Sequence, residues 1–505
     1  MDLPIKGGSI MTTKKVGEET KKRNLKPLWI VVAFLSLIII CLLPNDGSTL
    51  PIVGQRALAI LAFAVILWVT EAVSYPVSSA MIIVLLSILL GLSPSMDDPS
   101  TTMGTSNALK LALGGFSSSS VALVAAALFL AAAMQVTNLH KRLALWILSM
   151  VGTKTKSIVF GAILVSIILA FFVPSATARA GAVVPILLGI VAAFGLSNES
   201  RLAALLVITA TQAVSIWNIG IKTAAAQNLV ALGFINSEFN QDVTWIDWFI
   251  YAAPFSICMS VLLYFVMIKL IKPETDTIDG GKEIIHQQLR ELGPLKRKEI
   301  TLIITSIILL FLWATETKLH PFDSTTVTIA AIAFLLLPKI GVFNWKEASA
   351  KIDWGTIIVF SVGISLGTVL LNTKGALWLS DAVFGSIGLD SMPLLATIAL
   401  VTVFNIIIHL GFASATSLAS ALIPVLIALA STLPDVNNIG FVLIQQFVIS
   451  FGFLLPVSAP QNMLAYGTGS FTTKDFLKSG IPLTIGAYIL VLILSATYWK
   501  WIGLL

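Results

Sequence analysis

Charged residues are scarce in this sequence. Asp, Glu, Lys and Arg together make up 11% of the 505 residues, whereas hydrophobic residues make up 57%. A soluble globular domain carries roughly a quarter charged residues, so the composition excludes that class of protein. It indicates a polytopic membrane protein. We expect it to be all-α, because helices pair their own backbone groups in lipid.

Cysteine and histidine are also rare, and the motifs of several enzyme classes are missing. Cys41 and Cys258 lie in apolar runs, which favours buried thiols over a disulfide or a metal pair. The four histidines form no His-Glu-x-x-His motif, and no paired-aspartate metal motif occurs. We therefore expect no enzyme activity, no cofactor and no metal site. A cation/proton antiporter is also disfavoured, because the apolar runs hold no paired carboxylates.

Apolar runs are abundant. A transmembrane helix needs ~17–25 mostly apolar residues, and runs of this kind predict about 11 transmembrane helices. They lie near residues 28–43, 55–73, 76–92, 119–138, 201–216, 248–271, 300–313, 324–338, 354–371, 440–457 and 480–501. Two further apolar stretches, around 157–196 and 392–433, are interrupted by polar residues.

Basic residues gather in two polar segments, the N-terminal tail 1–27 and the segment 272–299. Cytoplasmic loops of membrane proteins carry the excess of Lys and Arg, so both segments are expected to be cytoplasmic. The net charge of +6 is therefore a topology signal and does not indicate nucleic-acid binding. We expect a multi-pass protein of the cell membrane with a cytoplasmic N-terminus and an external C-terminus.

Short motifs recur in the same order on both sides of segment 272–299, with offsets of roughly 230 to 245 residues. They are the pairs Trp68-Val69-Thr70-Glu71 and Trp313-Ala314-Thr315-Glu316, Ala144-Leu145-Trp146 and Ala376-Leu377-Trp378, Ser175-Ala176-Thr177 and Ser414-Ala415-Thr416, and Gln227-Asn228 and Gln461-Asn462. In the predicted topology, the span that contains Trp68 runs from the outside to the cytoplasm, and the span that contains Trp313 runs in the opposite direction. Residues 28–271 and 300–505 therefore read as an inverted repeat, as in many secondary transporters, with 272–299 as a cytoplasmic linker.

Each Ser-Ala-Thr run interrupts an apolar stretch, after Pro174 in the first copy and after Gly411 in the second. An interrupted helix in a membrane must be buried in protein or line a cavity. We expect two re-entrant hairpins whose second arms begin at the tips, with Ser or Thr as the helix N-cap. A helix N-terminus offers free N–H groups and partial positive charge, which suit a carboxylate. An isolated Ser-Ala-Thr would more simply mediate helix packing or bond its own backbone, but its duplication in register favours a site.

A second kind of interruption occurs at residues 218–228 and 456–462, where amide side chains, glycine and proline indicate unwound helices. Ionisable residues within the membrane are costly and usually functional. Arg179, Lys222 and His409 lie close to the interruptions and are candidates to compensate the charge of an anion. Snorkelling to the membrane surface is the alternative explanation for such residues.

These features resemble the divalent anion/sodium symporter family, which transports Krebs-cycle dicarboxylates and citrate. Residues 174–181, Pro-Ser-Ala-Thr-Ala-Arg-Ala-Gly, are similar to the branch of bacterial citrate/succinate antiporters and plastid oxoglutarate/malate translocators, and residues 456–462 look like the second unwound segment of the family. The resemblance implies a homodimer and an elevator motion between two domains. The scaffold would span about 28–140 and 300–372, and the transport domain about 143–271 and 376–505.

The hairpin tips and the unwound segments supply the substrate-binding candidates. These are Ser175, Ala176, Thr177, Thr223, Asn228, Ser414, Ala415, Thr416 and Asn462. The expected partners are a di- or tricarboxylate substrate and the lipid bilayer.

The sequence departs from the sodium-coupled members at the tips. Those members have asparagine in the middle of each tip, where this chain has Ala176 and Ala415, and a hydroxyl residue four positions before the tip serine, where it has Phe171 and Leu410. Sodium is a hard cation that prefers several oxygen ligands. We therefore expect sodium-independent exchange of dicarboxylates such as succinate, 2-oxoglutarate or malate, with fixed protein charges in place of sodium. A sodium- or proton-coupled di- or tricarboxylate symporter is the alternative.

Overall fold

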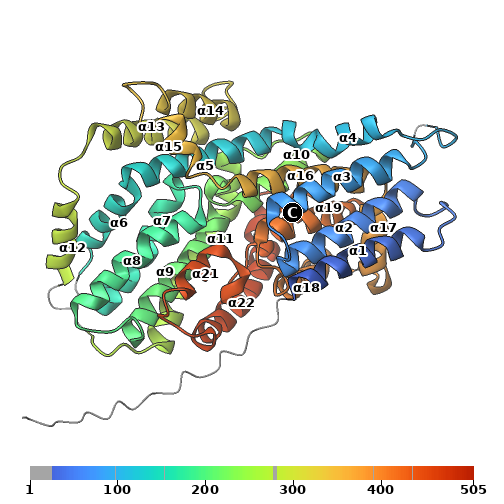
Figure 1. Ribbon diagram of the computed structural model, residues 1–505. Coiled ribbons are helices and arrows are strands. Elements are labelled where there is room, and N and C mark those ends of the chain that lie inside the picture. The colour runs from blue at the N-terminus through green and yellow to red at the C-terminus, as the bar shows by residue number, and fades with distance from the viewer. Residues whose placement is uncertain (1–24, 97, 153, 277–280, 390–391, 435) are drawn as a thin grey trace, which may run out of the picture.

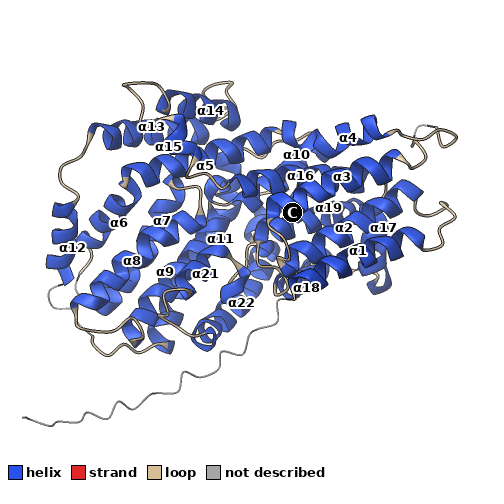
Figure 2. Cartoon of the chain, viewed as in Figure 1, coloured by secondary structure: helices blue, strands red, loops and turns tan. Residues whose placement is uncertain are grey.

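The computed structural model describes residues 25–96, 98–152, 154–276, 281–389, 392–434 and 436–505. Among these residues the regular structure is helical, with two isolated β-bridges and no strand (Figure 2). The expectation of an all-α membrane protein is confirmed. Residues 1–24 of the N-terminal tail lie outside the described residues.

The first half of the chain forms helices α1 to α11 (Figure 1). Their bounds are α1 Lys26–Leu42, α2 Ile52–Thr70, α3 Tyr75–Leu85, α4 Thr105–Leu113, α5 Ser119–Thr137, α6 Leu139–Met150, α7 Thr155–Phe172, α8 Ala176–Ala193, α9 Arg201–Gly220, α10 Ala226–Phe239 and α11 Trp245–Leu270. A π-helical turn at Leu86–Leu90 extends α3, and a 3-10 turn, η3, lies between α9 and α10 at Lys222–Ala224.

The second half begins after α12, Gly281–Glu291, which lies in the linker. Its helices are α13 Arg297–Ala314, α14 Ser324–Leu335, α15 Trp345–Ser349, α16 Trp354–Asn372, α17 Gly375–Phe384, α18 Leu394–His409, α19 Ala415–Thr432, α20 Asn438–Ile449, α21 Pro460–Tyr466, α22 Thr473–Ala496 and α23 Tyr498–Trp501. A 3-10 turn, η6, lies between α20 and α21 at Pro456–Ser458.

The same succession of elements occurs in both halves. A pair of helices joined by a short tip, α7 with α8 or α18 with α19, is followed by a helix that is broken at a 3-10 turn. A long helix, α11 or α22, then follows. This succession matches the order of the sequence motifs, so each Ser-Ala-Thr run lies at a tip and each Gln-Asn pair lies just after a break.

Nine described helices have the length and apolar composition to cross a membrane, and three of these are hairpin arms: α7, α8 and α19. One predicted span is wrong in extent. The run 440–457 does not form a continuous helix, because α20 ends at Ile449 and irregular backbone follows up to Pro456. Apolar composition extended the prediction through this break, whereas Gly452 and Pro456 disfavour a continuous helix there.

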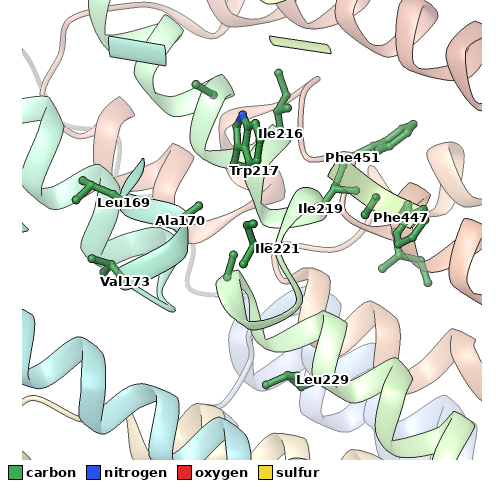
Figure 3. Packing of buried hydrophobic residues seen from close by; sticks show 14 of the residues in the cluster. Leu169, Ala170, Val173, Ile216, Trp217, Ile219, Ile221, Leu229, Phe447 and Phe451 are labelled. Carbon is green, nitrogen blue, oxygen red and sulfur yellow. The ribbon is translucent and has the colours of Figure 1, made fainter. Parts of the chain in front are cut away.

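The breaks are embedded in a tightly packed apolar core. Figure 3 shows residues from the ends of α7, α9 and α20, from the first break and from the start of α10. They include Leu169, Val173, Trp217, Ile221, Leu229, Phe447 and Phe451. Because association within lipid depends on close van der Waals packing, this core holds the irregular backbone in place.

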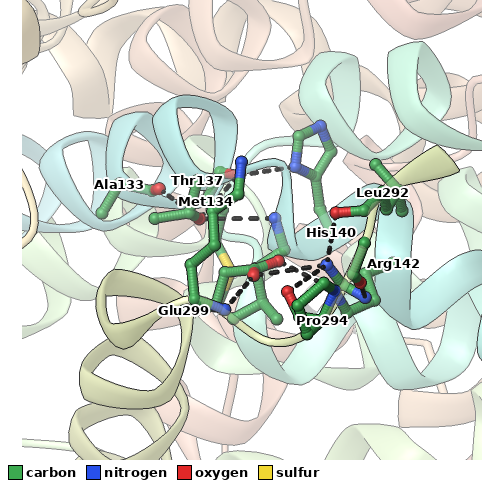
Figure 4. A network of polar contacts seen from close by, with 11 residues as sticks. Ala133, Met134, Thr137, His140, Arg142, Leu292, Pro294 and Glu299 are labelled. Carbon is green, nitrogen blue, oxygen red and sulfur yellow. Dashed lines mark hydrogen bonds and ion pairs between the residues drawn. The ribbon is translucent and has the colours of Figure 1, made fainter. Parts of the chain in front are cut away.

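The linker is fixed to the first half at several points. Arg142 of α6 forms an ion pair of 2.8 Å with Glu299 of α13 and donates to the carbonyls of Leu292, Gly293 and Pro294 (Figure 4). The Glu274 carboxylate accepts hydrogen bonds from the first backbone N–H groups of α9 at 2.7 and 3.0 Å. Partial burial by itself raises the pKa of Glu274, but these N–H donors outweigh that effect and hold the pKa below its usual value.

One sequence in α16, Gly363-Ile364-Ser365-Leu366-Gly367, has the form Gly-x-Ser-x-Gly that surrounds the nucleophile of many hydrolases. Here it lies inside a continuous helix and makes no sharp turn. The Ser365 hydroxyl donates to Ser361 of its own helix and accepts from the backbone of Gly115. This serine therefore joins α16 to the backbone at Gly115.

Candidate functional site

Each hairpin tip ends one helix and starts the next within a few residues. Val173 and Ser175 are extended, and Ser175 is the N-cap of α8, accepting a hydrogen bond from the backbone of Ala178 at 3.3 Å. At the second tip, Ser414 is the N-cap of α19 and accepts from Ser417 at 3.3 Å. The prediction that Ser or Thr of each tip caps the returning helix is confirmed, and the cap is the serine in both copies.

In each broken helix, an asparagine side chain forms hydrogen bonds with backbone carbonyls at the break. Asn228, near the start of α10, donates to the carbonyls of Asn218 at 2.7 Å and Ile221 at 3.2 Å. Asn462, near the start of α21, donates to Gly452 at 2.7 Å and Leu455 at 3.4 Å. Each asparagine thus satisfies carbonyls that the break leaves without a helical partner, and holds the unwound backbone in one conformation.

The two tips and the two breaks meet around one cavity with a volume of about 660 Å³. Its lining contains both Ser-Ala-Thr runs together with the first residues of α10 and α21. The polar lining from these elements is Ser175, Thr177, Asn218, Gln227, His409, Ser414, Thr416, Ser450, Ser458 and Gln461. The rest of the polar lining comes from α3, α5, α6 and α16 and from residues that directly precede α6 and α16; it is Tyr75, Gln135, Asn138, His140, Lys351, Asp353 and Thr356.

The structure brings together some of the candidates from the sequence and leaves others apart. Ser175, Ala176, Thr177, Ser414, Ala415, Thr416 and His409 all line the cavity. Thr223, Asn228, Asn462, Lys222 and Arg179 are buried and do not belong to its lining. Lys222 directs its ammonium group to the carbonyl of Val243 at 2.7 Å.

Arg179 and His409 make corresponding contacts with the two breaks. The fully buried guanidinium of Arg179 donates to the side chain of Asn218 and, at 3.0 Å, to the carbonyl of Ala224, the last residue of η3. The Nε2 atom of His409 lies 3.3 Å from the carbonyl of Ser458, the last residue of η6. Each hairpin therefore brings one basic side chain to the same position of a broken helix.

Two glutamines in the cavity wall were not among the candidates from the sequence. Gln227 donates to Ser450 at 3.3 Å, and Gln461 donates to Ser215 at 3.1 Å. The repeated Gln-Asn pair was a usable signal, but it did not reveal that the first residue of each pair faces the cavity. No sequence pattern indicated the contributions of Tyr75, Lys351 or Asp353 from distant helices.

Phe171 lies in an aromatic cluster behind the first tip. Its ring centroid is 6.4 Å from that of Trp217, 6.1 Å from that of Trp245 and 6.0 Å from that of Phe249. The side chain at this position therefore offers no oxygen ligand and packs against apolar rings. Among the described residues no group of three or more His, Cys, Asp or Glu side chains is arranged to hold a metal ion.

The cavity is suited to an anion, because donors outnumber negative charges around the tips. The first turn of a helix leaves N–H groups without intrahelical partners. The serine caps use the N–H groups of the third residues of α8 and α19, so those of Ala176, Thr177, Ala415 and Thr416 remain available. Helix α10 also starts at the cavity, and the partial positive charges of the three helix ends add together there.

This fold and this site define a polytopic membrane transporter. The chain belongs to the divalent anion/sodium symporter family, since the family model for the sodium:sulfate symporter transmembrane region matches residues 22–505. A similar protein described as a membrane protein, from Cupriavidus necator, is 49% identical over 476 residues, which cover 94% of this chain and 93% of that protein.

Two relatives with described transport activities are more distant. The sodium-dependent dicarboxylate transporter SdcS of Staphylococcus saprophyticus is 25% identical over 94% of this chain and 92% of its own length. The L-tartrate/succinate antiporter of Escherichia coli K12 is 28% identical over 84% of this chain and 87% of its own length. The crystal structure of the YdaH transporter of Alcanivorax borkumensis aligns with a TM-score of 0.54 at 14% identity, covering 86% of this chain and 99% of that one, and shows similarity of fold alone.

Proposed function

We propose that this protein exchanges small dicarboxylates, such as succinate, 2-oxoglutarate or malate, across the cytoplasmic membrane. The observation that carries the proposal is the meeting of two serine-capped tips in one cavity. A dicarboxylate has two anionic ends, and each tip offers hydroxyl and backbone donors to one of them. The described activities of the SdcS and L-tartrate/succinate relatives support this substrate class.

Within the cavity, we assign Ser175, Thr177, Ser414 and Thr416 to the substrate carboxylates, with the free N–H groups of the two tips. Hydrogen bonds that involve a charged partner are shorter and stronger than neutral ones. Ala176 and Ala415 leave room for the ligand at the middle of each tip, and Gln227 and Gln461 provide further amide donors.

Sodium independence follows from what occupies the positions around each tip. The middle residues are alanines, and Phe171 packs into an aromatic cluster, so side-chain oxygens are missing where a hard cation would need them. Arg179 and His409 instead contact carbonyl oxygens of the two breaks. The proposal rests on these two residues, since Lys222 is directed to Val243.

A fixed charge explains exchange better than net uptake. A sodium ion can leave an empty carrier, whereas the Arg179 guanidinium cannot. Moving an uncompensated charge through the membrane is costly. The empty transport domain is therefore proposed to cross slowly. A bound dicarboxylate compensates the Arg179 charge, and we propose that the loaded form crosses in both directions.

The crossing itself is proposed to be an elevator motion. Two residues with left-handed backbone conformation support the domain division: Asn138, at φ 57° between α5 and α6, and Lys374, at φ 60° between α16 and α17. Both fall at the expected boundaries between scaffold (28–140, 300–372) and transport domain (143–271, 376–505). The matching order of elements supports an inverted repeat, and the family resemblance is the support for a homodimer.

The proposed topology also gives the state of the carrier. Segment 272–299 and the N-terminus are placed in the cytoplasm by their basic residues. The cavity is lined by Asn138 and His140, close to Arg142, which contacts that segment. This arrangement is consistent with an inward-facing state.

The alternative is sodium- or proton-coupled symport. It is favoured by the description of SdcS as sodium-dependent, and by the Nδ1 atom of the buried His409, which has no hydrogen-bond partner. Replacing sodium by choline, and collapsing the proton gradient, during uptake by proteoliposomes separates coupled symport from exchange.

The proposed substrate class is tested by binding. Purified protein in detergent should be stabilised against heat by succinate, malate or 2-oxoglutarate, and not by acetate or sulfate at equal concentration. Stabilisation by a ligand grows with its concentration relative to Kd, by about 2.7 kcal/mol at a hundred times Kd. An equal response to sulfate and succinate would contradict dicarboxylate specificity.

A further inference from the structure

Two serine hydroxyls tie the two halves of the cavity to each other. Ser450, at the end of α20, accepts a hydrogen bond from the Gln227 amide at the start of α10 at 3.3 Å. Ser215, in α9, accepts from the Gln461 amide at the start of α21 at 3.1 Å. Gln227 and Ser215 precede the linker, whereas Gln461 and Ser450 follow it. Each bond therefore joins the second arm of the broken helix in one half to the first arm of the broken helix in the other.

These bonds belong to a wider set of ties between the halves. Gln212 of α9 donates to the carbonyl of Phe453 at 3.0 Å, and Gln446 of α20 donates to the side chain of Asn228 at 3.4 Å. The packing of the helices also joins the halves, because α8 of the first half packs against α21 of the second, and α19 of the second half packs against α10 of the first. The two breaks consequently hold one another in position.

Among these contacts, the hydrogen bonds from Gln227 to Ser450 and from Gln461 to Ser215 involve glutamines that line the cavity. Gln227 and Gln461 both line the cavity, although the two residues are only 7% and 4% exposed. An amide nitrogen carries two N–H groups. When a serine accepts one of them, the remaining N–H group and the amide oxygen are held in a fixed orientation relative to the tips.

We propose that Ser215 and Ser450 are positioning residues that fix the separation of the two carboxylate half-sites, and so select dicarboxylates by chain length. This inference rests on the proposed dicarboxylate function. Discrimination by length requires that the two half-sites hold their distance when a longer or shorter ligand binds. Without the serine hydroxyls, the glutamine amides turn freely and follow carboxylates at other separations.

The test measures counterflow into proteoliposomes with succinate, glutarate and adipate, which differ only in the number of methylene groups. Ser215→Ala, Ser450→Ala and the double variant are compared with the unaltered chain. Ser215→Cys and Ser450→Cys keep the volume of the side chain if an alanine variant fails to fold. The matched control is Ser361→Ala, because the buried Ser361 hydroxyl donates only to Ile357 of its own helix, α16.

We expect the KM for succinate to rise about fivefold in each single variant, the effect of losing one hydrogen bond. The ratio of the KM for adipate to that for succinate should fall by about threefold or more, while the maximal rate stays within about twofold. Ser361→Ala should change neither quantity. An equal rise of KM for all three acids, or no rise beyond that of Ser361→Ala, overturns the inference. Failure of the unaltered chain to carry any of the three acids contradicts the proposed function instead.

Discussion

The guanidinium of Arg179 donates to the carbonyl oxygen of Ala224 at 3.0 Å, which brings a basic side chain of α8 to the last residue of η3. His409 meets Ser458 at the corresponding place in the second half. Carbonyl oxygens exposed by a helix break are ligands that a mobile cation would otherwise use. The proposal of exchange without sodium rests on this pair of contacts.

Replacing Arg179 by glutamine removes that charge and shortens the side chain. Because hydrogen bonds to charged groups contribute about 1.5–3 kcal/mol, we expect succinate counterflow to fall by about tenfold or more. The matched control is Arg56→Gln, since Arg56 also donates to a backbone carbonyl, that of Leu89, but lies outside the cavity lining. Equal losses of transport in the two variants would show that the effect is general destabilisation.

His409→Gln keeps a donor for the carbonyl of Ser458 but removes the imidazole ring that lines the cavity. We expect the KM for succinate to rise by about fivefold, the effect of losing one hydrogen-bonding group at the site. His320→Gln is the control, because the Nε2 atom of His320 faces the carbonyl of Leu312 at 3.0 Å outside the cavity lining. A His409→Gln protein with unchanged KM would remove this residue from the site.

Gly367 of α16 is packed against α10 and α19 so closely that an added Cβ atom would overlap the ring of Phe234 and approach Pro424 to 2.7 Å. In Gly367→Val, we expect the transport rate to fall by about tenfold or more, because overpacking typically costs about 1–3 kcal/mol and this contact lies between the two domains that are proposed to slide. Stabilisation of the purified protein by succinate should persist. Gly114→Val is the control, since nothing lies within 4 Å of its added Cβ. Loss of binding together with transport would argue against a sliding interface.

Glu299→Gln leaves Arg142 without its charged partner while the carbonyl acceptors of the linker remain. The Glu299 side chain is only 3% exposed and that of Arg142 14%, so we expect a loss of about 2–4 kcal/mol in the free energy of unfolding. Chemical denaturation in detergent measures it. Glu347→Gln, at an exposed helix cap, should cost about 1 kcal/mol or less. Comparable losses in both variants would contradict a special role for the Arg142 ion pair.

The hairpin tips were predictable from the sequence because their signal is local. A serine after Pro174, or shortly after Gly411, followed by a long apolar run is enough to define a helix N-cap, and the structure has both caps. The positions of both breaks were likewise indicated by amides, glycine and proline. The extent of α20 was not, because a 12-residue helix and a full span have the same apolar composition.

The direction of individual side chains could not be predicted. Asn228 and Gln227 are neighbours in the sequence, yet Asn228 donates hydrogen bonds to backbone carbonyls and Gln227 lines the cavity. Lys222 and Arg179 are both buried cations, but they bond to carbonyls in different parts of the chain. Such choices depend on where distant helices place their acceptors, which is a property of tertiary packing.

The most direct measurement of the central claim is uptake of labelled succinate by proteoliposomes containing the purified protein. With unlabelled dicarboxylate inside, we predict equal uptake in sodium and in choline buffers. Without internal dicarboxylate, we predict no uptake above that of protein-free vesicles under an inward sodium gradient. Sodium-driven accumulation into vesicles that hold no dicarboxylate would contradict obligatory exchange and the role assigned to Arg179 and His409.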